Sequence, residues 1–193
     1  ARERLIELPE PFGSHPQWII PHAETRTAHA YLNDKGIRLI EVRGTWPPKN
    51  MQLVRAMYDW GFLRNDPIQV GKQTIGIMDA ISLYLQRAPE GRQTELYGYA
   101  LHVQVIGQRA GRRYEHVLTN THPPSDGSVP GWAGLRAYTR SVGIPLAIGA
   151  QLIAAGAVQD NGVVMPEFAF KPQLVIDELA RRKIFIHETI FQL

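Results

Sequence analysis

A group of polar residues near position 22 has the side chains needed to hold a small polar ligand. His22, Glu24 and Thr25 bring an imidazole, a carboxylate and a hydroxyl close together, and Thr27 follows. His15, His22 and Glu24 could together ligate zinc or iron, because both metals bind imidazole and carboxylate groups. Their spacing matches no established metal-binding signature, so we predict no metal site. The other interpretation is that these side chains satisfy the backbone of a turn.

A second group of this kind lies at residues 43–45. Arg43 can bind a carboxylate through two parallel hydrogen bonds, Gly44 lets a ligand approach the backbone, and Thr45 adds a hydroxyl. The alternative is a structural turn, in which Arg43 pairs with Glu24 or Asp59. The sequence leaves both interpretations open.

The segment between these two groups predicts a turn, a helix and a strand. Residues 25–33 favour a helix, which Gly36 ends in a left-handed conformation. The apolar run at residues 37–42 predicts a strand, and the double proline at 47–48 forces a new element to begin. We therefore expect the turns at the two ends of residues 21–48 to meet at one edge of a sheet.

The clearest strand pattern in the chain lies in residues 94–121. Apolar residues alternate with small or polar ones from Tyr97 to Val105, and a glycine-containing turn leads into a return strand at residues 113–119. This pattern predicts an antiparallel hairpin with one buried face. A broad sheet of this kind could also serve as a dimer surface.

The remaining pattern predicts an α+β fold, with a mixed, largely antiparallel sheet and helices packed on one face. The predicted helices cover residues 49–59, 78–85, 132–141 and 146–155, and a last helix opens at Pro172. Gly143 to Pro145 separate the third and fourth of them. Without an internal repeat or a domain boundary, residues 1–193 are expected to form a single domain. Because the chain starts directly on a predicted strand, we expect it to be a fragment of a longer protein.

Composition excludes several classes of function. The chain contains no cysteine, which removes disulfides, thiolate metal ligands and thiol nucleophiles. The net charge is only +3, and basic residues are scattered among acidic ones, unlike the basic stripe of a nucleic-acid binder. No apolar run approaches the ~18–20 residues of a membrane helix. We expect a cytoplasmic protein that binds neither nucleic acid nor a membrane.

Common catalytic and cofactor motifs are absent from the sequence. The chain has no Gly-x-Ser-x-Gly turn of a serine hydrolase and no glycine-rich phosphate loop. We therefore expect no dinucleotide to bind to this chain alone. His116 and His122 could act as general bases, but histidines on a predicted strand more often belong to the face of a sheet.

Five short motifs occur in order along the chain. They are Pro21-His22-Ala23-Glu24-Thr25, Glu41-Val42-Arg43-Gly44-Thr45, Tyr58-Asp59-Trp60-Gly61-Phe62-Leu63, Val142-Gly143-Ile144-Pro145 and Gly162-Val163-Val164-Met165-Pro166-Glu167. Each motif is weak alone, but in this order they resemble the C-terminal, substrate-binding domain of the saccharopine dehydrogenase-like family. That family includes saccharopine reductases, lysine 6-dehydrogenases and carboxynorspermidine-forming enzymes. The resemblance covers roughly the whole chain.

The resemblance implies an α+β domain that carries the substrate and dimerises through its sheet. In such enzymes an N-terminal Rossmann domain binds NAD or NADP, and hydride passes between the nicotinamide and the carbon of a C–N bond. The resemblance therefore implies a homodimeric NAD(P)-dependent oxidoreductase with a small amino-acid or amine substrate. The present chain alone is expected to be inactive and to bind no cofactor.

The resemblance also implies roles for individual residues. His22 and Glu24 become the catalytic candidates, for contact with a substrate ammonium or for proton transfer, and Arg43 becomes a candidate for a substrate carboxylate. Further substrate contacts are implied at Thr25, Gly44, Thr45, Gly143 and Pro145. The chain departs from saccharopine reductases at Ala23, which stands where those enzymes carry an arginine. This departure favours a smaller or less acidic amine than saccharopine.

Two other functions fit the same residues. The first is a non-catalytic domain that binds a small ligand or acts as a scaffold while sharing the fold. The second is a metal-dependent enzyme built on His15, His22 and Glu24. A glycine-rich nucleotide-binding unit encoded upstream would favour the oxidoreductase over the scaffold.

Overall fold

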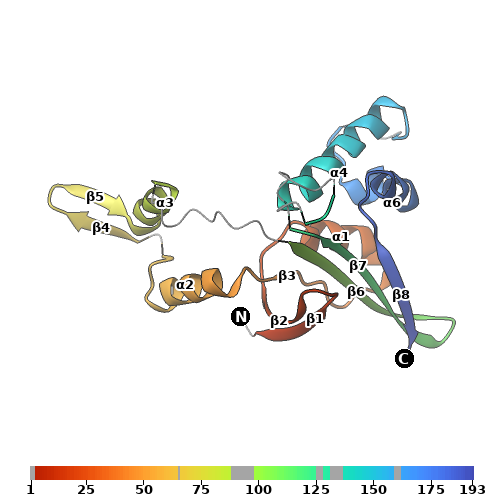
Figure 1. Ribbon diagram of the computed structural model, residues 1–193, viewed down its shortest axis with the longest axis horizontal. Coiled ribbons are helices and arrows are strands. Elements are labelled where there is room, and N and C mark those ends of the chain that lie inside the picture. Colours follow the sequence, from red (N-terminus) through yellow and green to blue (C-terminus); the bar gives the residue numbers. More distant parts are fainter. Residues whose placement is uncertain (1–2, 65, 88–97, 125–127, 131–136, 159–161) are drawn as a thin grey trace. The chain divides into compact units, whose positions relative to one another are not determined.

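The computed structural model describes residues 3–64, 66–87, 98–124, 128–130, 137–158 and 162–193. The chain divides into two compact units (Figure 1). One consists of Ala1–Gly44 with Leu96–Leu193, and the other of Thr45–Glu95. Helices and antiparallel strands occur in both, so the predicted α+β class is confirmed. The described strands form three small sheets.

The first sheet of the larger unit has the order β1-β2-β3. β1 (Arg4–Leu8) pairs along its whole length with β2 (Gly13–Ile19). β2 also pairs with β3, which comprises only Arg43–Gly44. β1 therefore lies at an edge of this sheet, as expected for a strand followed by prolines.

The predicted strand at residues 37–42 is wrong. In this segment only β3 pairs with β2. One further hydrogen bond, from the N–H of Ile20 to the carbonyl of Val42 at 3.0 Å, extends the pairing. β2 ends at Ile19, and Pro21 cannot donate a ladder hydrogen bond, so residues 37–41 have no partner there. Leu39 accordingly remains 71% exposed.

A helix and a short 3-10 turn join β2 to β3. α1 (Glu24–Leu32) is followed by η1 (Asn33–Lys35), and Gly36 ends the pair in a left-handed conformation with φ of 70°. This agrees with the predicted helix and its glycine stop. No residue of α1 is buried. The helix contacts α5 (Pro166–Ala169), where Tyr31 and Phe168 meet edge to face at 5.1 Å.

The long hairpin is confirmed within the described residues. β6 (Tyr99–Arg109) pairs with β7 (Arg112–His122), and β7 pairs with β8 (His187–Gln192). Ala110 and Gly111 form the two-residue turn with φ of 50° and 76°. Two positive φ values in succession are typical of the turn that best matches the twist of a hairpin. The three strands lie side by side in Figure 1.

The apolar face of this sheet is not buried, which corrects the sequence prediction. Leu101, Val103 and Val105 alternate along β6 and are 49–51% exposed, and Ile190 on β8 is 53% exposed. Val105 lies opposite His116, which in turn lies opposite Ile190, so these side chains share one face. The alternation was identified correctly, but no described part of the chain covers these side chains fully.

The buried core of the larger unit lies instead between two helices. α4 (Ala137–Ala154) packs against α6 (Pro172–Arg181), as Figure 1 shows. Ile148 and Leu152 on α4 form a buried cluster with Leu179 and Ile184. Phe170 packs against this cluster and lies beside Gly149, where an added Cβ would approach its ring at 3.6 Å.

The predicted break at residues 143–145 is also wrong, because α4 continues through Pro145. A proline inside a helix removes one backbone hydrogen bond and is destabilising. Ile144 and Ile148, one turn apart, both contact the buried cluster. Burial of these side chains therefore holds the helix together across the proline.

In its described residues, 45–64 and 66–87, the smaller unit contains two helices and a hairpin. α2 (Pro48–Asp59) precedes β4 (Pro67–Val70) and β5 (Gln73–Gly76), and α3 (Ile77–Arg87) follows at once. The two helices agree with those predicted at residues 49–59 and 78–85. None of the helices within the described ranges has both the length and the apolar character needed to cross a membrane.

Candidate functional site

The first predicted group is assembled at the start of α1. His22 Nδ1 is paired with a carboxylate oxygen of Glu24, and the hydroxyl of Thr25 donates to the carbonyl of His22 at 2.7 Å. The side chains of His22 and Glu24 are 48% and 56% exposed, so both are accessible to a ligand. Glu24 lies in the first turn of the helix, where the macrodipole favours a carboxylate. An exposed imidazole–carboxylate pair can contact an ammonium group or transfer a proton.

A contact that was not predicted lies one turn further along α1, at Thr27 of the same polar group. The hydroxyl of Thr27 donates to Oε1 of Glu167, at 2.6 Å and across 140 residues of sequence. Oε2 of Glu167 is buried and accepts no hydrogen bond within the described residues. The motif that ends on Glu167 was visible in the sequence, but nothing in it indicated Thr27 as the partner.

The second predicted group has a different environment. Arg43 donates from Nε to one oxygen of Glu41 at 2.7 Å and from Nη2 to the other at 3.1 Å. Nη1 of Arg43 also lies 3.4 Å from the backbone carbonyl of Gln17. Hydrogen bonds from Arg43 hold the pKa of the Glu41 carboxyl below its ordinary value, against the opposing effect of burial, and the positive charges of Arg43 and Arg4 act in the same direction.

The guanidinium of Arg43 is therefore already engaged by a carboxylate of the chain itself. Its side chain is 13% exposed, and that of Glu41 is 23% exposed. The alternative prediction, that Arg43 pairs with a carboxylate of the chain, is correct, but the partner is Glu41 instead of Glu24 or Asp59. A substrate carboxylate would have to displace Glu41 to reach Arg43. The assignment of Arg43 to the substrate remains a prediction.

The strand pairing brings only part of the second predicted group to the end of the ladder that leads to His22. In the antiparallel pairing, Trp18 lies opposite Gly44 and Ile19 lies opposite Arg43. The chain that leads to His22 therefore leaves this short ladder at one end, and the chain that continues from Gly44 leaves it at the other. The expected meeting of the two turns therefore stays a prediction for Arg43, whereas the strand order opposes it for the residues after Gly44.

The glycine and the threonine of the second group have local structural explanations. A Cβ on Gly44 would lie 3.0 Å from Cδ1 of Ile20, so glycine permits the close approach of β3 to β2. The hydroxyl of Thr45 donates to the carbonyl of Trp46 at 3.2 Å. These contacts leave the predicted ligand roles of Gly44 and Thr45 untested.

Gly143 and Pro145 lie within α4 and offer no polar side chain to a ligand. An added Cβ on Gly143 would meet no atom within 4 Å, and this residue is exposed. Pro145 is half-buried. Their predicted contact with a substrate remains a prediction.

The histidines of the long hairpin belong to the sheet. His122 is 2% exposed, and its Nδ1 donates to the carbonyl of Pro123 at 2.7 Å. Burial lowers the pKa of His122, which the hydrogen bond to Pro123 partly opposes. His116 pairs with Glu188 across β7 and β8 at 3.0 Å. Among the described residues, no group of three or more metal-ligating side chains is close enough together to hold an ion.

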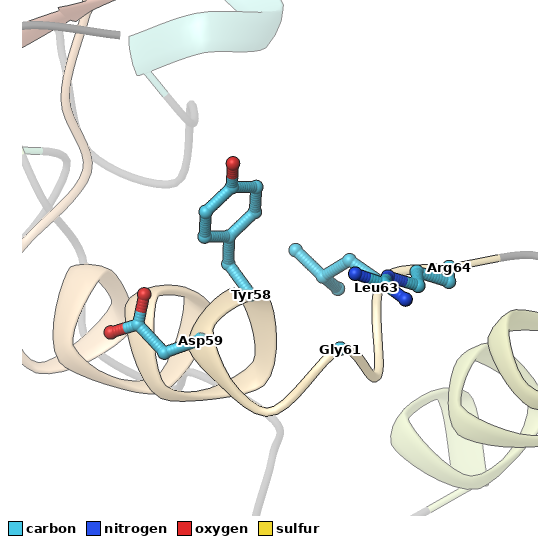
Figure 2. A pocket seen from close by; sticks show the side chains of 5 residues that line it. All are labelled: Tyr58, Asp59, Gly61, Leu63 and Arg64. Carbon is cyan, nitrogen blue, oxygen red and sulfur yellow. The ribbon is translucent and has the colours of Figure 1, made fainter.

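A hollow of about 320 Å³ lies in the smaller unit, at the end of α2. Figure 2 shows Tyr58 and Leu63 rising on the same side, with Asp59 to one side of them and Arg64 to the other. The side chain of Arg64 passes within 3.7 Å of the position of a Cβ on Gly61, the residue that turns the helix end with φ of 77°. A cation there stabilises the last carbonyls of the helix. We therefore assign this hollow to the ending of the helix.

Comparisons with known proteins agree with the order of the motifs. No curated protein matches the chain. The saccharopine dehydrogenase C-terminal domain family matches residues 8–184, which is most of the sequence and includes every residue of both candidate groups. The match contains α1, the long hairpin and α6 of the larger unit and α2 and α3 of the smaller one, so it covers both units of the structure. The chain belongs to the saccharopine dehydrogenase C-terminal domain family.

Proposed function

We propose that this chain is the substrate-binding and dimerisation domain of an NAD(P)-dependent oxidoreductase that acts on a C–N bond of an amino acid or amine. The observation that carries the proposal is the family match over residues 8–184. The accessible imidazole–carboxylate pair of His22 and Glu24, at the start of a helix, supports it.

The nucleotide belongs to a separate domain in this proposal. The described residues do not fit a dinucleotide, because no glycine-rich loop joins a strand to a helix. α2, α5 and α6 each begin with a proline, which removes one backbone N–H from the helix start that would bind a phosphate. When bound by its own domain, a nicotinamide supplies hydride transfer, and the residues of this chain bind and orient the amine.

The charges near the candidate site favour an amine over a dicarboxylic substrate. Glu24 is accessible, whereas Arg43 is held by Glu41. A substrate ammonium group can reach Glu24 without breaking an ion pair between Arg and Glu. Ala23 replaces the arginine of saccharopine reductases, so a second substrate carboxylate would depend on Arg26, the exposed arginine in the first turn of α1.

The exposed apolar face of the long sheet supports dimerisation. Leu101, Val103, Val105 and Ile190 lie on one face and are each about half exposed. The pair of His116 and Glu188 lies among them on the same face, and exposed apolar side chains gathered with polar ones commonly mark an interface. We propose that a second copy covers this face. Val103→Glu should then convert a dimer into a monomer in sedimentation experiments, whereas a variant that stays dimeric would exclude this face.

The enzymatic proposal is tested with the full-length protein that carries this domain. Reduction of NAD+ and NADP+ should depend on an added amine when lysine, saccharopine and polyamine precursors are screened. Binding of one of these amines without any reduction of either cofactor would favour the alternative, a ligand-binding or scaffold domain with the same fold.

A further inference from the structure

The bond between Thr27 and Glu167 joins two segments that are distant in sequence but adjacent to the candidate site. Glu167 lies in α5, and Thr27 lies one turn after Glu24 on α1. Side chains three residues apart on a helix lie on the same side, about 5–6 Å apart. Glu167 therefore holds α1 at a point one turn after Glu24.

α1 depends on such contacts because it has little hydrophobic anchoring of its own. None of its residues is buried, and no side chain caps its first turn. Its contact with α5 includes the Thr27–Glu167 hydrogen bond and the edge-to-face contact of Tyr31 with Phe168. A helix held in this way can shift when either contact is lost.

α5, in contrast, is tied to the buried core. Phe170 directly follows this short helix, donates its N–H to the carbonyl of Pro166 at 3.1 Å, and packs against the cluster of Ile148 and Leu152. A continuous path therefore runs from the core through Phe170 and Glu167 to Thr27 and the start of α1.

We infer that Glu167 is a positioning residue for the candidate site: by accepting the Thr27 hydroxyl, it fixes the helix start that carries His22 and Glu24. This inference rests on the proposed function. It assigns Glu167 a role that needs an acceptor oxygen facing Thr27 but needs no negative charge.

Matched variants of the full-length protein test this role. Glu167→Gln and Thr27→Ser keep an acceptor and a donor, whereas Glu167→Ala and Thr27→Val remove them. If Glu167 positions the helix, Glu167→Ala and Thr27→Val lose about 10–100-fold in kcat/KM. The loss should come mainly through kcat, since misplaced catalytic groups slow the reaction of bound substrate. Glu167→Gln and Thr27→Ser should keep kcat/KM within about threefold of wild type. The double variant Glu167→Ala with Thr27→Val should lose little more kcat/KM than either single variant.

A different pattern would overturn the inference. If Glu167 contacts the substrate directly, Glu167→Gln should lose as much activity as Glu167→Ala, mainly through KM, while Thr27→Val stays near wild type. Equal activity in all four variants would also contradict the positioning role. Assays well below the unfolding temperature of every variant separate these effects from a loss of folded protein.

Amide hydrogen exchange distinguishes failure of this inference from failure of the proposed function. Thr27→Val and Glu167→Ala should speed exchange in residues 24–32, and the two conservative variants should not. Unchanged exchange in all variants would overturn the positioning role whatever the enzyme assays give. If Thr27→Val and Glu167→Ala speed exchange but the wild-type protein reduces no nicotinamide with any amine, only the proposed reaction is rejected.

Discussion

The two polar groups of residues 21–48 contain similar side chains but differ in what they are free to do. His22 and Glu24 form an exposed pair at the first turn of a helix, and each side chain is about half accessible. Glu41 and Arg43 form a two-bond pair beside a strand, with most of both side chains covered. The first pair can receive a ligand without losing structure, whereas the second stabilises the local fold. Accessibility, more than residue type, distinguishes them.

The largest effect should come from the exposed pair. In the full-length protein, Glu24→Gln should lower kcat/KM for the amine by about 100-fold, because it removes the charge that faces the ammonium or the transferred proton. The unfolding temperature should hardly change, since the side chain is exposed. Steady-state kinetics and thermal unfolding measure the two effects. Glu41→Gln serves as the control, and a larger kinetic loss in that variant would reverse the comparison.

The covered pair should affect stability instead. Arg43→Met should reduce the free energy of unfolding by about 2 kcal/mol, since it leaves the partly buried carboxylate of Glu41 without its main donors. Denaturant unfolding measures this change, and a double variant with Glu41→Gln should recover part of the loss. An unchanged free energy of unfolding together with a strongly raised KM in Arg43→Met would instead indicate that Arg43 binds the substrate.

The smallest effect should appear in the pH dependence of folding. Because hydrogen bonds from Arg43 lower the pKa of Glu41, this carboxyl contributes stability above its unfolded pKa of about 4.5, and that contribution disappears as the pH falls through the lower folded value. The difference in unfolding free energy between wild type and Glu41→Gln should therefore shrink as the pH is lowered from 7 towards 3. A difference that grows under acid would contradict the assigned direction.

Local signals predicted much of the fold. Gly36 ends the 3-10 turn after α1 as expected, and the alternation from Leu101 to Val105 corresponds to a real strand. These predictions succeeded because glycine conformation and strand periodicity are properties of short segments. The order of the family motifs was likewise readable from the chain alone and agrees with the match over residues 8–184.

Predictions that needed a distant partner failed. Residues 37–42 have a strand-like pattern, but β2 ends too early to pair with them, and α4 continues through Pro145 because its neighbours are buried against α6. The same limit applied to the site. Glu167 as the partner of Thr27 requires a contact across 140 residues and cannot be inferred from spacing. Glu41 lies two residues before Arg43, a spacing that places both side chains on one side of extended backbone, so this pairing was readable from the sequence but was missed.

The most direct measurement is amine-dependent reduction of NAD+ or NADP+ by the full-length protein, comparing wild type with Glu24→Gln and Glu41→Gln at saturating cofactor. The proposed function predicts reduction with at least one amino acid or amine by wild type, a large loss in Glu24→Gln and near-normal turnover in Glu41→Gln. No reduction with any amine by a folded protein that binds its nicotinamide, or full activity of Glu24→Gln, would contradict the assignment of the substrate site to the start of α1.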